Sequence, residues 1–181
     1  LEVIAQMSEA LRISILRTDV LETSISKVSE ILKIDGAYIA MVDEQTEEII
    51  MHKAMGIWMP IEGTVLQRGE GLGGHIISTG EIYVNQQPQT DPYVVRPDLV
   101  SSMASIAGVP LITNGRTIGT LVVGSKHRLL ENEISLLKAI GDFTASALHR
   151  AELFEHSSLQ ARELKQAYNS TLEGWALALE L

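Results

Sequence analysis

The stretch Gly69-Glu-Gly-Leu-Gly-Gly74 has residue types that match a known chemical motif. It formally fits G-x-G-x-x-G, whose glycines let a backbone approach the pyrophosphate of a dinucleotide. That motif follows a buried strand, and Val65–Arg68 is too short and too polar to be one. The stretch also nearly fits a phosphate-binding loop, but His75 occupies the position of the required lysine. We therefore favour a flexible lead-in to a short helix at Leu72–Ser78, ended by Gly80.

The other titratable residues do not form a recognisable catalytic or metal-binding pattern. His149 and His156 are seven residues apart, whereas two histidines that chelate one ion along a helix lie three or four apart. Glu70, Asp91 and Asp98 could form an acidic pair, although carboxylates in loops are usually solvated. The spacing of these residues therefore predicts no metal site.

The composition excludes several functional classes. Cysteine is absent, which excludes disulfides, iron–sulfur clusters, thiolate zinc sites and cysteine nucleophiles. The formal net charge of −9 argues against binding to nucleic acid or to an anionic membrane surface. No run approaches the roughly 18 apolar residues of a membrane span and no signal peptide is visible, so we expect a cytoplasmic protein. The first residue is Leu and not Met, so we expect a fragment of a longer chain.

Two apolar runs, Met103–Ile112 and Ile118–Gly124, flank the dipeptide Asn114-Gly115. This dipeptide predicts a β-hairpin, because a type I′ turn needs positive φ at both central residues. Neither run alternates between apolar and polar residues, which is typical of strands covered on both faces, so the hairpin should lie in the middle of a sheet. Pro110 predicts a bulge or bend. Three glycines indicate either tight packing or room for a ligand: Gly108, Gly119 and Gly124.

Patterns of apolar residues predict the remaining elements of the fold. Residues 1–34 should form two helices, the second with Thr18 or Asp19 as its N-cap. Further strands are expected at residues 37–42, 48–54 and 82–84. Three prolines fall within residues 85–101, which should form an ordered loop. A loop of this length is more often a binding element than a plain connector.

Ser105–Leu111 followed by Asn114–Gly124 resembles the fourth and fifth strands of a GAF domain, and the resemblance extends in order over residues 18–150. It implies an α+β fold, with a central antiparallel sheet of about six strands, helices packed on the sheet, and a role in sensing small molecules. The implied organisation is an N-terminal helix at 1–17 acting as a dimerisation arm, a sensor domain at 18–150 and a linker helix at 151–181.

The resemblance also implies a pocket between the sheet and its covering loop, for a small-molecule ligand of unknown identity. The lining that it implies is Trp58, Leu72, His75, Ile76, Tyr83, Asp91, Tyr93, Ser105 and Val123. Without cysteine, neither covalent attachment of a bilin nor reduction of free methionine sulfoxide is expected, and the cofactor stays unknown. The signature of GAF domains that bind cyclic GMP is not recognisable, so cyclic nucleotide binding is open but unsupported.

Residues 130–181 contain no proline and predict one long helix. Positions spaced alternately by three and four form a weakly apolar seam, better suited to a shifting signalling helix than to a permanent rod. We expect a parallel homodimer through Ile140, Ala147, Ala151, Phe154, Ala161, Tyr168 and Leu172. The alternative, a helix packed on its own domain, stays open up to residue 150.

Gln166–Leu181 resembles the first helix of an HD-GYP domain, the cyclic di-GMP phosphodiesterase family, whose metal ligands would follow in a longer chain. The sequence leaves three functional hypotheses. The favoured one is a non-catalytic sensor that controls an output domain through a dimeric helix. The alternatives are a structural dimerisation module without a ligand, and an enzyme.

Overall fold

A six-stranded antiparallel sheet forms the centre of the computed structural model, which describes residues 5–6, 9–11, 14 and 16–179. Its strand order is β3-β2-β1-β6-β5-β4. The strands are β1 (Gly36–Val42), β2 (Ile49–Gly56), β3 (Val65–Leu66), β4 (Tyr83–Asn85), β5 (Ser105–Thr113) and β6 (Arg116–Ser125). The helices are α2 (Arg17–Leu32), α3 (Gly71–Thr79) and α4 (Glu131–Leu179), with 3-10 turns η1 (Met59–Ile61), η2 (Pro88–Thr90) and η3 (Pro97–Val100). The predicted α+β architecture is therefore confirmed.

The β5–β6 hairpin forms as its turn residues predict. Asn114 and Gly115 have φ values of 51° and 76°, the positive values that a type I′ turn requires. The register of the two strands shifts between Leu111 and Ile112, one residue beyond Pro110. Strand β4 pairs with β5 only as far as Gly108, so Pro110 interrupts no ladder on that side.

Tight packing explains the glycines of this hairpin. A Cβ atom on Gly119 would overlap the carbonyl oxygen of Ala40, and one on Gly108 would overlap the side chain of Ile76. Neither position leaves room for a ligand. Of the two interpretations that the sequence allows for these two glycines, close packing is the correct one.

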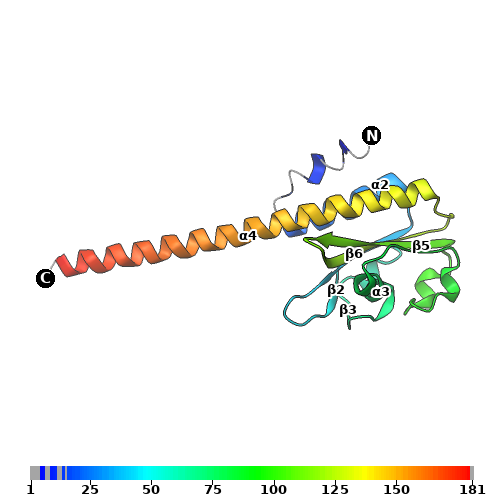
Figure 1. Ribbon diagram of the computed structural model, residues 1–181, viewed down its shortest axis with the longest axis horizontal. Helices are drawn as coiled ribbons and strands as arrows, with labels where there is room; N and C mark the ends of the chain where they lie inside the picture. Colours follow the sequence, from blue (N-terminus) through cyan, green and yellow to red (C-terminus); the bar gives the residue numbers. More distant parts are fainter. Residues whose placement is uncertain (1–4, 7–8, 12–13, 15, 180–181) are drawn as a thin grey trace.

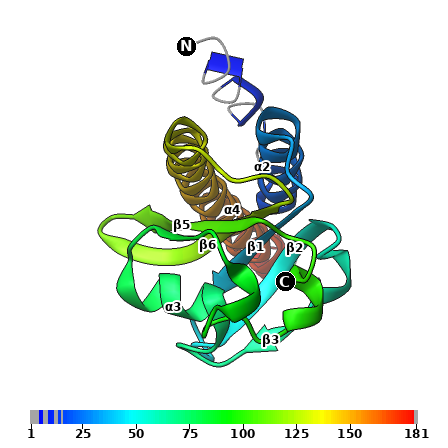
Figure 2. The same cartoon turned by 90° about the vertical axis from the view of Figure 1, so that its right-hand side faces the viewer.

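The sheet separates two clusters of buried apolar side chains. Figures 1 and 2 show the helices on its two faces. Helices α2 and α4 lie side by side on one face, and α3 lies on the other. Because successive side chains of a strand point to opposite faces, the neighbours Val122 and Val123 of β6 belong to different layers. Val123 packs under α2 and α4, and Val122 packs on the side of α3.

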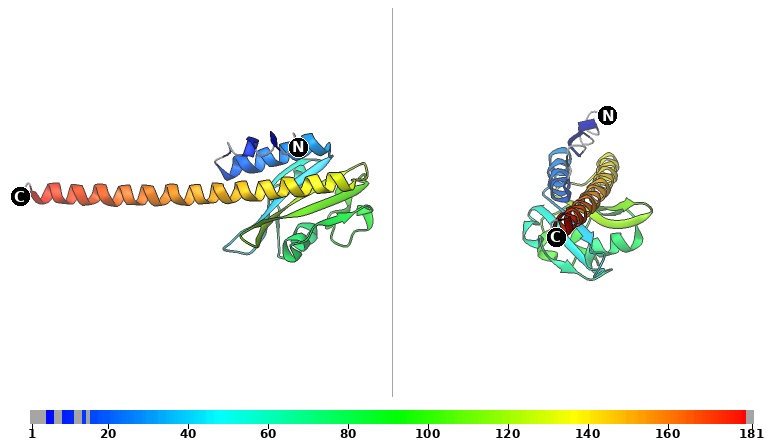
Figure 3. Two further views of the ribbon diagram at one scale, coloured as in Figure 1. Left: turned by 45° about the horizontal axis from the view of Figure 1, so that its top comes forward. Right: turned by 90° about the vertical axis from the view of Figure 1, so that its left-hand side faces the viewer.

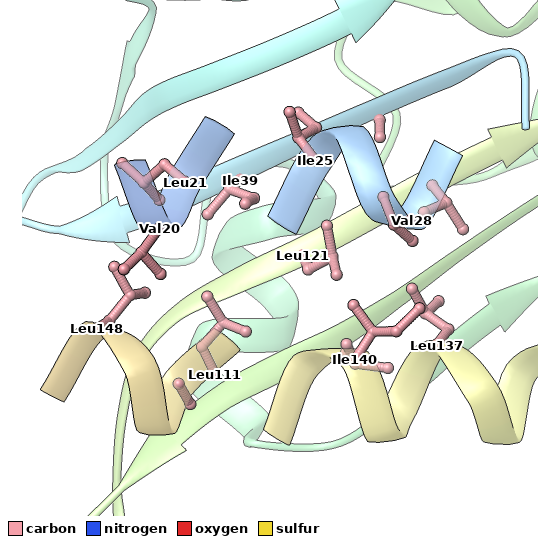
Figure 4. Close-up of a cluster of buried hydrophobic side chains, with 14 of the residues drawn as sticks. Val20, Leu21, Ile25, Val28, Ile39, Leu111, Leu121, Leu137, Ile140 and Leu148 are labelled. Atoms are coloured by element: carbon pink, nitrogen blue, oxygen red, sulfur yellow. The ribbon is translucent and has the colours of Figure 1, made fainter. Parts of the chain in front are cut away.

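Figure 4 shows the layer between the sheet and the two helices. Three seam residues predicted to form a dimer interface are buried here in their own domain, with exposed fractions of 1% each: Ile140, Ala147 and Ala151. Their assignment to a dimer interface is wrong. The heptad-like spacing could not reveal this, because α4 presents the same residues to the sheet that a coiled coil would present to a partner.

A cluster of polar residues joins β6 to the start of α4. The Ser105 hydroxyl donates to the carbonyl oxygen of His127 (2.8 Å) and accepts from the amide of Leu129 (3.1 Å). At the first turn of α4, a Glu133 carboxylate oxygen accepts the amide proton of Leu130 (2.8 Å), and the other lies 3.1 Å from His127 Nε2. Burial raises the pKa of Glu133, but the hydrogen bonds from Leu130 and His127 outweigh burial, so the net pKa is lowered. The orientation of α4 on the sheet is thus fixed at its N-terminus.

Beyond Ala151, α4 leaves the domain and extends alone (Figures 1 and 3). Its 49 residues span about 74 Å at 1.5 Å per residue. Large apolar side chains on this extension are exposed: Leu153, Phe154, Leu159, Leu164, Tyr168 and Leu172. No helix among the described residues is long and apolar enough to cross a membrane.

At the N-terminus, residues 5–6 and 9–11 are helical, in agreement with the predicted first helix, and most of its other residues lie outside the described ones. Leu11 is buried against the α2–α4 layer. Helix α2 begins at Arg17 with Leu16 as its N-cap, so the prediction of Thr18 or Asp19 in that role is wrong. No side chain caps this helix, whose position is fixed by packing instead.

The contact between α2 and α4 includes a buried polar pair that gives a testable prediction. The Thr144 hydroxyl hydrogen-bonds to Ser24 Oγ (3.0 Å) and to the Ile140 carbonyl oxygen (2.8 Å). Thr144→Val should lower the free energy of unfolding by about 1–3 kcal/mol, because it leaves the Ser24 hydroxyl buried without its partner. Urea denaturation at a fixed protein concentration measures this change.

Two variants control this experiment. Thr171→Val makes the same change on the exposed extension of α4 and should alter stability by less than about 0.5 kcal/mol. Adding Ser24→Ala to Thr144→Val should recover part of the loss, since both polar groups are then removed. Equal effects of the two valine variants would contradict the proposed contribution of the pair.

Candidate functional site

A cavity of about 240 Å³ opens on the face of the sheet opposite α2 and α4. Strands β1, β2, β3 and β5 supply its floor, the first turn of α3 and the segment around η1 supply two walls, and residues 93–100 cover it. The lining residues are Tyr38, Met51, Trp58, Ile61, Thr64, Leu66, Gly71, Leu72, Tyr93, Val94, Val95, Arg96, Leu99, Val100 and Ile106.

Trp58 joins the wall of the cavity to its cover. Its indole Nε1 donates a hydrogen bond of 3.0 Å to the carbonyl oxygen of Leu99, at η3. Its ring lies 5.6 Å from the ring of Tyr38, centroid to centroid, at a tilt of 56°. Trp58 is only 4% exposed, so it acts as a fixed aromatic wall of the cavity and not as a mobile surface residue.

The floor of the cavity contains one ionisable side chain, Tyr38. Burial raises the pKa of the Tyr38 phenol far above its usual value, and a backbone hydrogen bond from Gly73 offsets only part of that effect. The phenol therefore stays neutral throughout the physiological range. Its ring contributes apolar surface, and its hydroxyl lies against the first turn of α3.

The buried carboxylate of Asp91 holds the start of the covering segment. One oxygen accepts hydrogen bonds from the Tyr83 hydroxyl (2.9 Å) and Asn85 Nδ2 (2.7 Å), and the other accepts from the amide of Tyr93 (2.8 Å). Asp91 is 7% exposed, and these three donors compensate for its loss of hydration. The Asp91 carboxylate thus fixes the position at which the cover leaves β4.

Three rings in mutual contact, those of His75, Tyr83 and Tyr93, connect this carboxylate to the cavity. His75 stacks on Tyr93 at a centroid distance of 3.9 Å and an angle of 16°, and Tyr83 meets both rings edge-on. Burial raises the pKa of Tyr83 to about 12, with the hydrogen bond and negative charge of Asp91 adding to the effect. Because Tyr93 also lines the cavity, a molecule bound there would contact one member of this cluster directly.

The structure separates the nine predicted lining residues into three groups. Trp58, Leu72 and Tyr93 line the cavity. His75, Tyr83 and Asp91 lie beside it in the cluster behind the cover, and Ile76 is fully buried where α3 packs on the sheet.

Two of the nine lie on the opposite face of the sheet, which corrects the expectation that they line the cavity. Val123 packs in the layer under α2 and α4. The Ser105 hydroxyl is used in the connection from β6 to α4. The error has a simple cause: β5 and β6 are buried on both faces, so hydrophobicity does not show which residues of each strand face which layer.

Sequence reasoning also missed most of the apolar lining. Tyr38 and Ile106 come from strands β1 and β5, whose two faces are both buried, which hides the alternation of their side chains. Met51 lies in β2, where buried Met51 is followed by exposed His52, so alternation was an available signal there. Val94 and Val95 lie in the proline-rich loop whose covering role was predicted, and their apolar side chains between polar neighbours were the available signal.

The lining contains one charged side chain, Arg96, and it already has a partner. Its Nε and Nη2 atoms donate to the two carboxylate oxygens of Asp98 at 2.9 and 2.7 Å. Within the described part of the chain, no group of three or more histidine and acidic residues could hold a metal ion. The cavity therefore offers apolar surface and aromatic rings in place of catalytic groups.

Comparison with known proteins gives consistent results. The sequence profile of the GAF domain matches residues 17–149, and no curated protein matches the chain. The GAF domain of a phosphoenolpyruvate-protein phosphotransferase from Coxiella burnetii is 20% identical, with a TM-score of 0.75 over 84% of this chain and 94% of that chain.

Two further solved structures share the fold. A free methionine-R-sulfoxide reductase from Neisseria meningitidis, in complex with its substrate, is 20% identical, with a TM-score of 0.72 over 84% of this chain and 89% of that chain. A GAF domain/HD domain protein from Geobacter sulfurreducens is 11% identical, with a TM-score of 0.65 over 77% of this chain and 96% of that chain. At these identities the similarity shows the fold alone.

The raised pKa of Tyr83 predicts a loss of stability in alkali. A tyrosine whose pKa in the folded state exceeds the usual value of about 10 stabilises the fold fully below pH 10, and this contribution is lost as the pH rises towards 12. Tyr83→Phe should therefore lose less stability than the wild type over this pH range. Urea unfolding at several alkaline pH values measures the difference.

Tyr168→Phe is the matched control, because that ring is 63% exposed on the α4 extension. It should retain the alkaline loss of the wild type. If Tyr83→Phe also retained the full loss, the raised pKa of Tyr83 would not account for the pH dependence.

Proposed function

The chain belongs to the GAF domain family, and from that premise we propose that it is the sensor module of a signalling protein. In this proposal a small molecule occupies the cavity, and α4 transmits its binding to an output domain. The observation that carries the proposal is that the cavity and α4 lie on opposite faces of the same strands. Tyr38 of β1 lines the cavity, while its neighbours Ala37 and Ile39 pack in the α2–α4 layer. Displacing β1 at the cavity would therefore also displace the surface on which the helices rest.

The chain itself is proposed to be non-catalytic. The reductase among its structural neighbours shares only the fold, and the 181 residues of this chain contain no cysteine with which to reduce a sulfoxide. The cavity is lined mainly by apolar and aromatic side chains, and its one charged side chain, Arg96, is paired with Asp98. A structural dimerisation module without a ligand stays the alternative, and under that alternative the cavity would bind nothing.

The proposed output is a domain of the HD-GYP type following α4. Two observations support it: the resemblance of residues 166–181 to the first helix of that family, and the GAF domain/HD domain protein among the structural neighbours. We propose that the protein acts in the cytoplasm, without contact with nucleic acid, in keeping with its net charge of −9.

In this proposal, the extension of α4 pairs with the same segment of a second copy of the chain, in a parallel homodimer. Ala161 and four larger side chains would form the contact, since they are exposed in the single chain: Phe154, Leu164, Tyr168 and Leu172. The buried residues of α4 up to Ala151 are excluded from this revised interface. A contact confined to the extension would let the helices shift without disturbing the packing of the sensor.

The ligand proposal predicts that blocking the mouth of the cavity abolishes a ligand effect. Val95 lines the cavity and is 54% exposed, so Val95→Trp should fill the mouth without disturbing the core. The small-molecule filtrate of a bacterial lysate should raise the melting temperature of the wild type but not of this variant. Thermal denaturation with and without filtrate measures the shift.

Val65→Trp is the matched control, because Val65 is 48% exposed but does not line the cavity. It should respond like the wild type. Absence of any shift in the wild type, or equal shifts in both tryptophan variants, would favour the structural module.

The dimer proposal predicts the effect of a charge on the extension. Phe154→Asp should weaken association by about 3 kcal/mol, roughly a hundredfold, because the carboxylate would be buried without a partner. His156→Asp places the same charge on the opposite side of the helix and should leave the dimer intact. Light scattering at tens of micromolar should give the mass of two chains for the wild type and for His156→Asp. A monomeric wild type would contradict the proposal.

A further inference from the structure

The chemistry of the cavity restricts the class of molecule that it could bind. Its buried lining is formed by side chains that are apolar or, for Tyr38, neutral: Tyr38, Met51, Leu72, Val100 and Ile106. The guanidinium of Arg96 is engaged by both oxygens of Asp98. A charged ligand entering this space would lose its hydration without gaining a counter-charge, which is strongly unfavourable.

The walls favour a flat ring system. Aromatic rings of Tyr38, Trp58 and Tyr93 surround the cavity, and aromatic side chains prefer offset-stacked or edge-on contacts with another ring. Trp58 and Tyr93 are held in place, the first by its hydrogen bond to Leu99 and the second by stacking on His75. Their orientation therefore exists before a ligand arrives, which lowers the entropic cost of binding.

The volume sets the size of that ring system. A dry cavity of about 150 Å³ is large enough for benzene, and ligand sites for drug-sized molecules begin at about 300 Å³. At about 240 Å³, this cavity lies between the two. It suits one aromatic ring or two fused rings, and it is too small for a nucleotide to be enclosed.

We propose that the cavity binds an uncharged aromatic molecule of one or two fused rings. This inference rests on the proposed sensor function and names its ligand class. The bound ring would lie among Tyr38, Trp58 and Tyr93, and an uncharged polar substituent would point to the mouth, where Thr64 is exposed.

Indole and indole carboxylate, the same ring system bearing one negative charge, are the probes that test the effect of charge. Isothermal titration calorimetry should show that the wild type binds indole at least roughly tenfold more tightly than indole carboxylate. The reason is that the carboxylate group must lose its hydration on binding, which is costly for a charged group. Val95→Trp should abolish indole binding. Phenol should bind about threefold more tightly than cyclohexanol, which has the same polar group on a saturated ring.

A variant that adds a positive charge to the protein tests whether the lack of a counter-charge weakens the binding of indole carboxylate. Thr64 is exposed at the mouth, so Thr64→Arg should place a positive charge there. The ratio of the affinity for indole to that for indole carboxylate should then fall at least threefold. Thr90→Arg, an exposed position outside the lining, should change neither affinity. Unchanged far-ultraviolet circular dichroism would show that each variant is folded.

The outcomes distinguish the ligand class from the sensor function. If indole carboxylate binds the wild type as tightly as indole, and Val95→Trp blocks both, the cavity is a binding site but the uncharged class is wrong. Equal binding of phenol and cyclohexanol would overturn the proposal that the cavity prefers an aromatic ring. If indole does not bind but the lysate filtrate shifts the melting temperature, only the ligand class fails. If neither indole nor the filtrate has an effect, the sensor function fails as well.

Discussion

The central strands of the sheet are buried on both faces, and the positions of the helices and of the cavity follow from this burial. Strands β1, β5 and β6 carry apolar side chains towards α2 and α4 on one face and towards α3 and the cavity on the other. Neither face can be left open, because each would expose a large apolar surface to water. Helices α2 and α4 therefore cover one face of the sheet, and α3 together with the covering segment covers the other.

The same constraint makes the sheet a mechanical connection between its two layers. Adjacent residues of one strand contact different layers, as Val122 and Val123 do. Close-packed interiors transmit small displacements because they contain little free volume. The absence of side chains at Gly108 and Gly119 leaves the space that Ile76 of α3 and the backbone of β1 occupy against the hairpin.

Helix α4 combines a fixed part with a free part. Its first turns are held by Glu133, by the Thr144–Ser24 contact and by the burial of Leu137 and Ile140. Past Ala151, the large apolar side chains from Leu153 to Leu172 are exposed among the described residues. A helix that is anchored at one end and exposed at the other moves as a whole when its anchor moves, which suits the proposed signalling role.

Local patterns in the sequence predict most of the elements, although strand β3 (Val65–Leu66) was not among the expected strands. Local backbone preferences of residues that are close in the chain account for four features of the fold. These are the Asn114-Gly115 turn, the end of α3 at Gly80, the proline-rich loop and the uninterrupted final helix. The resemblance to GAF domains identified the family, and the antiparallel sheet of six strands follows from it.

The identity of the side chains that share the cavity depends on how the whole chain packs. In β1, β5 and β6 both faces are apolar, so no sequence pattern distinguishes Tyr38 and Ile106, which line the cavity, from Val123, which does not. The same ambiguity placed Ile140, Ala147 and Ala151 in a dimer interface, although the sheet covers them. A hydrophobic side chain carries no information about which apolar surface will cover it; the packing of the whole chain makes that choice.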